Sequence, residues 1–177
     1  EKKEINIKKI QKHFKKSLNF NRYYSSREWA YKDVKPKVFA EKLLESSYDK
    51  DLIDYKFFCF NGVPKFIQVD SQRFINHRRN FFSMNWDELP YKKSNVMRNE
   101  KKIRKPKKLN EMIWIASELS YSFPFSRIDL YNLKNSEEEN IRFGEITFYP
   151  GGAITRFEPD FLNKDFGELI NIGHFEC

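Results

Sequence analysis

The sequence of 177 residues has few of the residues that build specialised scaffolds, with only 2 cysteines, 6 glycines and 7 prolines. Two cysteines, Cys59 and Cys177, are too few for a disulfide framework or a cysteine-based zinc site, and they suit a reducing compartment. Glycine and proline are too scarce for a collagen-like or low-complexity protein. The sequence contains no run of about 18 apolar residues, so it predicts no transmembrane helix. We therefore expect a cytoplasmic globular protein.

The chain is rich instead in basic charge and in aromatic side chains. Lys and Arg number 33 against 25 Asp and Glu, giving a net charge of +8, and 17% of the residues are aromatic. Nine of the basic residues lie in segment 92–108, and seven lysines lie in the first sixteen residues. This balance favours anionic partners such as nucleotides, nucleic acid, membrane phosphates or acidic polymers. A solvated surface run is the plainer interpretation of both segments.

Hydrophobic periodicity predicts an α+β fold with one mostly antiparallel sheet. Apolar residues at helical spacing predict helices over 4–20 and 109–122, both packed on one face of the sheet, and a short helix over 164–172. The predicted strands are 37–44, 55–60, 63–70, 79–84, 125–132 and 141–148. Asn61-Gly62 predicts a type I′ turn. We treat residues 1–177 as a single domain, with the basic loop 92–108 inserted before helix 109–122.

Strands 125–132 and 141–148 bring charged residues together. If Asp129 lies opposite Glu145, residue 132 pairs with 142, and one face carries Arg127, Asp129, Glu145 and Thr147. Opposed carboxylates about 5 Å apart repel each other unless a cation lies between them. Mg²⁺ prefers one or two carboxylates together with phosphates, and an arginine beside them is suited to hold a phosphate. The alternative is a hairpin whose charged residues simply face water.

Five stretches of the chain carry motifs in a fixed order. They are REWAYKDVKPKVFAEKLL (27–44), DYKFFCFNGVPKFIQVD (54–70), HRRNFFSMNW (77–86), FPFSRIDLYN (123–132) and FGEITFYPGG (143–152). Together they resemble the TupA-like branch of the ATP-grasp ligases, which is linked to teichuronopeptide and other surface-polysaccharide biosynthesis. The resemblance implies an ATP-grasp-like fold and an enzyme that uses ATP and Mg²⁺. Such an enzyme activates a carboxylate as an acyl phosphate for attack by an amine or a hydroxyl.

The resemblance also implies roles for single residues. The implied metal ligands are Asp129, Glu145 and Thr147, the last at a position where most ATP-grasp enzymes have asparagine. The implied catalytic residues are Arg127, Lys56 and Arg73. The implied nucleotide-binding residues are Glu41, Lys42 and Leu44, at the adenine hinge, and Asp54, near the ribose. Arg78 and Arg79 are candidates for the acceptor side, where the substrate would be a carboxylate-bearing saccharide or amino acid. No specific nucleic-acid partner is implied.

No glycine occurs between residues 1 and 61, the region nearest to where the family's Gly-rich phosphate loop belongs. We therefore expect that the N-terminal part of the full fold lies outside this chain, and that the 177 residues alone bind ATP weakly and are inactive. The alternative is a non-catalytic module that binds polyanions or nucleotides. Segment 92–108 is its candidate contact with a membrane or an anionic polymer. Polyanion binding weakens steeply with salt, whereas a ligase site holds ATP only with Mg²⁺.

Overall fold

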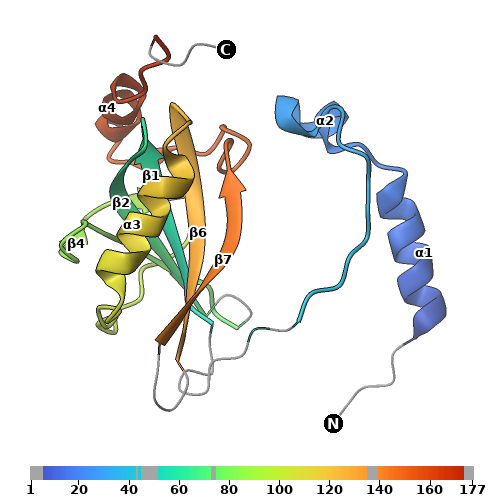
Figure 1. Cartoon of the computed structure of the whole chain (residues 1–177), viewed down its shortest axis with the longest axis horizontal. Helices are drawn as coiled ribbons and strands as arrows, with labels where there is room; N and C mark the ends of the chain where they lie inside the picture. The colour runs from blue at the N-terminus through green and yellow to red at the C-terminus, as the bar shows by residue number, and fades with distance from the viewer. Residues whose placement is uncertain (1–5, 43, 45–51, 73–74, 135–138, 174–177) are drawn as a thin grey trace. The chain divides into compact units, whose positions relative to one another are not determined.

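The computed structural model describes residues 6–42, 44, 52–72, 75–134 and 139–173. The chain forms two compact units, Glu1–Leu43 and Leu44–Cys177 (Figure 1). Each unit is described by itself below, and the prediction of one single domain stays a prediction. No helix in the described ranges is both long enough and apolar enough to cross a membrane.

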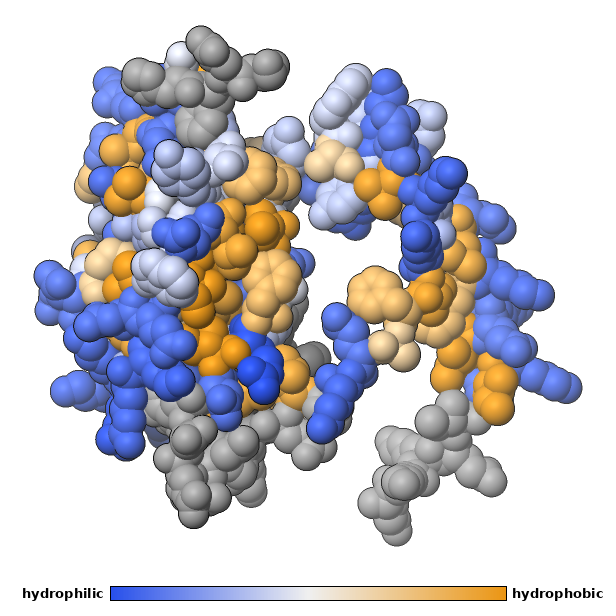
Figure 2. Space-filling model, in the orientation of Figure 1, coloured by the Kyte–Doolittle hydropathy of each residue, from blue (hydrophilic) through white to orange (hydrophobic). Residues whose placement is uncertain are grey.

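The first unit is helical. Its longest helix is α1 (Ile7–Leu18), which begins after Asn6, whose side-chain oxygen accepts a hydrogen bond from the backbone N–H of Lys9. The short helix α2 (Arg22–Ser26) and the 3₁₀ turn η1 (Trp29–Tyr31) follow. The predicted helix over 4–20 is thus confirmed in its described part. Figure 2 shows an exposed apolar side along α1, which consists of Ile7, Ile10, Phe14 and Leu18. Its packing against the sheet stays a prediction.

The predicted strand 37–44 is wrong for its described residues, because no strand forms over 36–42. A strand requires a partner with which to form a hydrogen-bonded ladder, and the described part of this unit offers only helices. The segment instead runs beside α1, where Pro36 and Val38 line a shallow hollow together with Phe14 and Leu18.

The second unit is built on a six-stranded sheet in the order β4-β3-β2-β1-β6-β7, in which all neighbours are antiparallel. Its strands are β1 (Asp54–Phe60), β2 (Val63–Ser71), β3 (Arg78–Phe82), β4 (Glu88–Leu89), β6 (Phe125–Lys134) and β7 (Glu139–Thr147). The α+β class and the antiparallel sheet are therefore confirmed. Asn61 and Gly62 join β1 to β2 with φ angles of 49° and 77°, the positive values that a type I′ turn requires.

One face of the sheet is apolar and is covered by α3 (Leu109–Ser120), which lies across the strands in Figure 1. Phe57 from β1 and Ile128 from β6 are fully buried there, against Met112 and Ala116 of the helix. Burial of each large apolar side chain contributes roughly 1.5–3 kcal/mol. The predicted helix over 109–122 and its position on this face are confirmed.

The opposite face is covered at one end by a two-stranded ribbon and a helix. The ribbon pairs β5 (Lys92–Lys93) with β8 (Phe157–Glu158), and α4 (Phe161–Glu168) follows it. They enclose an aromatic cluster, which consists of Phe58, Phe60, Phe66, Phe81, Phe157 and Leu162, with Tyr91, Phe125 and Phe166 around it. The last helix begins before its predicted start at 164, because Leu162 and Phe166 lie one turn apart and both pack on the cluster.

The basic segment 92–108 is only partly a solvated run. Lys93, Ile103 and Pro106 are buried, whereas most of the lysines and arginines around them are exposed. The interpretation of segment 92–108 as a solvated surface run is therefore wrong at these three positions. The pairing of β5 with β8 turns one lysine inward, because neighbouring residues of a strand point to opposite sides.

The hairpin of β6 and β7 has the predicted register only at its charged end. Asp129 lies opposite Glu145, as predicted, but Asn132 pairs with Ile141 and not with residue 142. A β-bulge at Gly144 shifts the register by one residue. A Cβ atom on Gly144 would lie 3.0 Å from the Asp129 carbonyl oxygen and 3.1 Å from the Tyr131 ring, so the close approach of the two strands requires glycine there.

Candidate functional site

Beside the aromatic cluster, the same sheet face carries buried charges. Asp54 and Lys56 of β1 point to this face, and Lys56 lies directly opposite Asp129 of β6. The three residues are between 2% and 6% exposed. The Lys56 ammonium lies 2.5 Å from a carboxylate oxygen of each aspartate. One buried cation is thus shared by two buried carboxylates, which is the condition under which such charges are tolerated in a protein interior.

The three predicted metal ligands converge on one atom, Nη2 of Arg127. It lies 2.8 Å from Asp129 Oδ2, 2.7 Å from Glu145 Oε1 and 3.0 Å from the Thr147 hydroxyl oxygen. Thr147 in turn donates a hydrogen bond to Glu145 at 3.0 Å. The register of β6 and β7 explains this convergence, since Arg127 pairs with Thr147 and Asp129 with Glu145. A single positive centre therefore contacts all three groups at once.

The two carboxylates of this hairpin differ in their surroundings. Burial raises the pKa of Asp129, and the opposing effects of Arg127 and Lys56 do not fully offset it. Burial acts in the same direction on Glu145, but there the Thr147 hydrogen bond and the Arg127 charge prevail and lower its pKa. The Glu145 side chain is 61% exposed, against 2% for Asp129. Glu145 is therefore the solvent-facing member of the pair and the one whose pKa is lowered.

A second buried ion pair lies on the neighbouring strands β2 and β3 of the same face, where Asp70 is the direct cross-strand partner of Asp54. Arg79 of β3 holds Asp70 of β2 with bonds of 2.7 and 3.1 Å, and Gln68 and His77 also contact that carboxylate. Burial alone would raise the pKa of Asp70, but Arg79 and the nearby Lys56 and His77 charges lower it. Of the two adjacent arginines of β3, only Arg79 takes part in this ion pair. Arg78 pairs with Ser71 and points to the other face of the sheet.

Lys93 is a residue of this region that sequence reasoning missed. Its side chain is buried, and its ammonium lies over the rings of Phe58 and Phe157, at 5.2 and 4.7 Å from their centroids. Burial, followed by the charges of Arg127 and Arg79, lowers its pKa to about 8. No sequence signal separates it from the eight other basic residues of segment 92–108, because only the ribbon pairing turns it inward.

The described structure does not place several predicted site residues relative to this region. Arg73 lies outside the described residues. Glu41 and Lys42 are exposed in the first unit, and Leu44 is half-buried at the edge of the undescribed stretch. Their contribution to a nucleotide site stays a prediction. Within the described ranges, no group of three or more His, Cys, Asp or Glu side chains is arranged to hold a metal by itself. A metal here would need ligands beyond the carboxylate pair.

An antiparallel sheet that carries paired carboxylates, an arginine and a lysine on one face suits a ligand composed of metal and phosphate. The comparison with known families agrees with this class of site. The model of the family described as TupA-like ATPgrasp matches residues 1–171, nearly the whole chain. The chain belongs to this family, which confirms the resemblance and implies ATP-dependent, ligase-type chemistry. Searches of curated proteins and of solved structures gave no match.

Proposed function

We propose that the charged face is the metal- and phosphate-binding half of an ATP-dependent ligase site, which activates a carboxylate as an acyl phosphate for attack by an amine or a hydroxyl. The observation that supports it best is the convergence of Asp129, Glu145 and Thr147 on one cationic atom of Arg127. The donor set has the composition that Mg²⁺ takes when phosphates complete its coordination.

Asp129 and Glu145 would hold the metal through their carboxylates, with the Thr147 hydroxyl as a third donor. Bound Mg²⁺ supplies positive charge that offsets the negative charge of the phosphate oxygens. Asp129 and Glu145 already hold a shared cation in Arg127, so a metal bound by the same oxygens would replace the guanidinium as their partner. The donor chemistry therefore fits the metal that the family implies.

Arg127 and Lys56 would bind the transferred phosphoryl group. Both belong to a rigid, fully paired part of the sheet, and the Arg127 side chain is only 12% exposed. A guanidinium released from its carboxylates presents two parallel N–H donors to an oxyanion, and Lys56 adds a point charge beside it. Positioning and charge stabilisation of this kind make up most of the catalysis in phosphoryl transfer.

The remaining assignments extend the same proposal. Glu41, Lys42 and Leu44 would contact the adenine, Asp54 the ribose, and Arg73 a phosphate or the substrate carboxylate. The substrate would be a carboxylate-bearing saccharide or amino acid used in bacterial surface-polysaccharide biosynthesis, a setting in the cytoplasm. These roles are supported by family membership and by the motif positions, Asp54 also by its contact with Lys56.

Metal binding by the full chain tests the proposal. We expect Mn²⁺, followed by electron paramagnetic resonance, to bind more tightly when ATP is present. We expect Asp129→Asn and Glu145→Gln each to weaken Mn²⁺ binding at least about tenfold. Glu118→Gln is the matched control, because Glu118 is an exposed carboxylate on α3, a helix of the opposite face. Unchanged Mn²⁺ affinity in both site variants would contradict the metal assignment.

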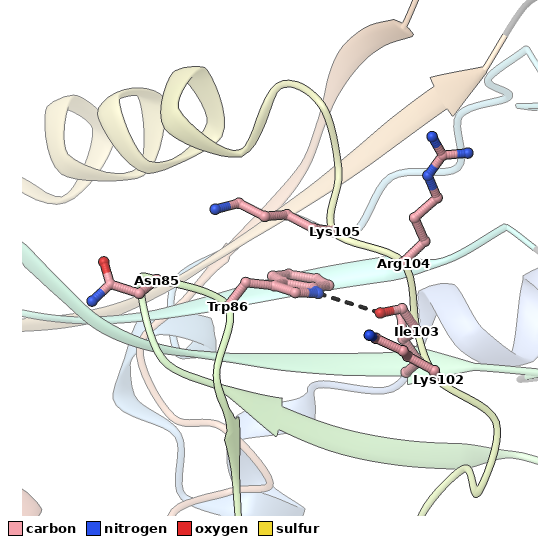
Figure 3. A pocket seen from close by; sticks show the side chains of 6 residues that line it. All are labelled: Asn85, Trp86, Lys102, Ile103, Arg104 and Lys105. Atoms are coloured by element: carbon pink, nitrogen blue, oxygen red, sulfur yellow. Dashed lines mark hydrogen bonds between the residues drawn. The ribbon is translucent and has the colours of Figure 1, made fainter.

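A second candidate function is favoured by a hollow beside the sheet, shown in Figure 3. Trp86 lies in it, stacked on Phe82 and hydrogen-bonded through its indole N–H to the Ile103 carbonyl oxygen. The basic side chains around it are those of Lys102, Arg104 and Lys105. An aromatic wall with three exposed cations suits an anionic polymer. Binding of heparin that falls steeply with salt and ignores Mg²⁺ would support this candidate, and salt-insensitive binding would exclude it.

A further inference from the structure

Lys93 has unusual surroundings for a lysine that is only 6% exposed. Buried lysines are ordinarily paired with a carboxylate. The Lys93 ammonium makes no hydrogen bond or ion pair with the described residues, and its close contacts are the rings of Phe58 and Phe157. Ring faces attract a cation, but they supply no hydrogen-bond acceptor of the strength of a carboxylate.

The charges around Lys93 explain why no internal partner serves it. The acid that acts on it is Asp70, which is already held by Arg79 through two hydrogen bonds. The other charges that act on Lys93 are the guanidinium groups of Arg79 and Arg127. Arg79 is moreover fixed beside it, because it donates a hydrogen bond to the Lys93 carbonyl oxygen at 3.1 Å. Arg79 and Arg127 are thus each engaged by carboxylates of their own, Arg79 by Asp70 and Arg127 by Asp129 and Glu145, and among the described residues no ion pair joins Lys93 to any of these three acids.

The position of Lys93 connects it to the charged site. Phe58, over which its ammonium lies, is the direct cross-strand partner of Arg127. Arg127 uses Nε and Nη2 for its bonds to Asp129, Glu145 and Thr147, whereas Nη1 donates to no group in the described part of the chain. Two cations from different elements, the ribbon and β6, thus have donors that no protein group engages.

We propose that Lys93 and Arg127 form one oxyanion subsite, in which a phosphoryl group or a carboxylate of the substrate is the counter-ion that Lys93 lacks. The inference rests on the proposed function, because it adds a binding residue to that site. The ribbon of β5 and β8 then acts as a positioning element, since its pairing holds a lysine over the sheet. The ligand is a small oxyanion, which is either a phosphoryl group of the nucleotide or the carboxylate of the substrate.

The full chain with ¹³Cε-labelled lysine tests the subsite by NMR at pH 7. The probes are inorganic phosphate, acetate and ATP with Mg²⁺, each titrated separately. We expect the Lys93 signal to shift with at least one probe while the Lys92 signal stays in place, since Lys92 is exposed on the other side of the ribbon. Response to phosphate and ATP but not acetate assigns the subsite to the nucleotide; response to acetate assigns it to the substrate carboxylate.

Variants give the second measurement. We expect Lys93→Met to weaken binding of the responding probe by about 10- to 100-fold, the value of one charge-assisted hydrogen bond. Lys92→Met removes an equal charge from the same ribbon and should change the affinity for that probe by less than about twofold. Lys93→Arg should restore most of the affinity for the probe. The NMR titration uses the wild-type chain, so its result does not depend on whether a variant folds. No shift at Lys93 with any probe, or equal losses in the two Met variants, would overturn the subsite.

The two proposals can fail separately. If Asp129→Asn abolishes metal-dependent ATP binding while Lys93→Met leaves every probe unaffected, the subsite is wrong and the ligase site stands. If phosphate or acetate binding depends on Lys93 while ATP and Mg²⁺ do not bind at all, the oxyanion subsite stands and the ligase assignment fails.

Discussion

The two faces of strand β1 are equally buried but chemically opposite. All seven residues of the strand are buried. Toward α3 it presents Tyr55, Phe57 and Cys59, and toward the ribbon it presents Asp54 and Lys56 before the aromatic Phe58. Burial of the apolar residues stabilises the fold, whereas burial of the charged pair costs desolvation energy that its ion pairs only partly offset. Burial on the α3 face therefore stabilises the fold, whereas burial of the charged residues on the opposite face costs stability.

Cys59 illustrates the apolar side of this comparison. It is fully buried, and burial raises the pKa of its thiol to about 12. A thiol with so high a pKa forms almost no thiolate at neutral pH, so Cys59 is a packing residue and not a nucleophile. The charged side keeps ionised groups in a similar degree of burial, which requires the partners described for Asp54, Lys56 and Asp129.

The largest effect is expected on the α3 face. Phe57→Ala removes a fully buried ring and leaves a cavity against α3, so it should lower the free energy of unfolding by about 3–5 kcal/mol. Urea denaturation followed by tryptophan fluorescence measures this. Trp114→Ala is the control, because Trp114 is 62% exposed on the same helix and should cost much less. Similar losses in both variants would contradict the assignment of the core to this face.

On the charged face, Lys56→Met removes the cation shared by Asp54 and Asp129. Breaking a buried ion pair in this way should cost about 3 kcal/mol at pH 7. The pKa of Asp129 is already raised by burial and should rise further, so the folded state binds more protons than the unfolded state as pH falls. The deficit of the variant should therefore shrink as the pH falls from 7 toward the ordinary pKa of an aspartate. A deficit that stays constant as the pH falls would show that Asp129 is not the carboxylate that loses its partner.

The pH dependence of stability reports on Lys93. Its folded-state pKa of about 8 lies below the ordinary value of 10.5, so the unfolded chain binds more protons between these values. Stability should therefore rise as pH increases from about 8 to about 10.5, by roughly 1–3 kcal/mol after allowance for the two rings. Thermal melts of Lys93→Met should lack this rise, whereas Lys92→Met should keep it. A rise of equal size in both variants would assign it to other groups.

The smallest effect is expected at the bulge. Gly144→Ala places a Cβ 3.0 Å from the Asp129 carbonyl oxygen, so the two strands must separate slightly. We expect a loss of about 1 kcal/mol in stability, together with weaker Mn²⁺ binding, because the bulge adjoins the Asp129–Glu145 pair. Gly167→Ala, at a helical position with nothing within 4 Å, should leave Mn²⁺ binding unchanged and raise stability by up to about 1 kcal/mol, because alanine favours the helix over glycine. Unaltered Mn²⁺ affinity in Gly144→Ala would show that the pair tolerates a change of register beside it.

Local patterns in the sequence were sufficient for most elements of the second unit. Asn61-Gly62 specified its hairpin because few other residues accept two successive positive φ angles, and the alternation along 125–132 and 141–148 specified which charges share a face. The pairing of Asp129 with Glu145 was a supposed register, which the structure confirms at this end of the hairpin. The prediction of a strand at 37–44 was wrong because its pattern of apolar residues also suits an irregular segment that packs on a neighbour. A local pattern does not specify a strand's pairing partner.

By itself, the sequence determined the family and the antiparallel class of the sheet, and it indicated that Asp129 and Glu145 share a face, because these depend on motifs and on the period of two along a strand. Only the tertiary structure decided that both carboxylates accept hydrogen bonds from one nitrogen of Arg127, that Lys56 joins β1 to the same site, and that Lys93 is buried among aromatic rings. These contacts join residues up to 73 positions apart, such as Lys56 and Asp129. The order of the strands and the pairing of a two-residue ribbon create these contacts, and neither can be recognised from a periodic pattern in the sequence.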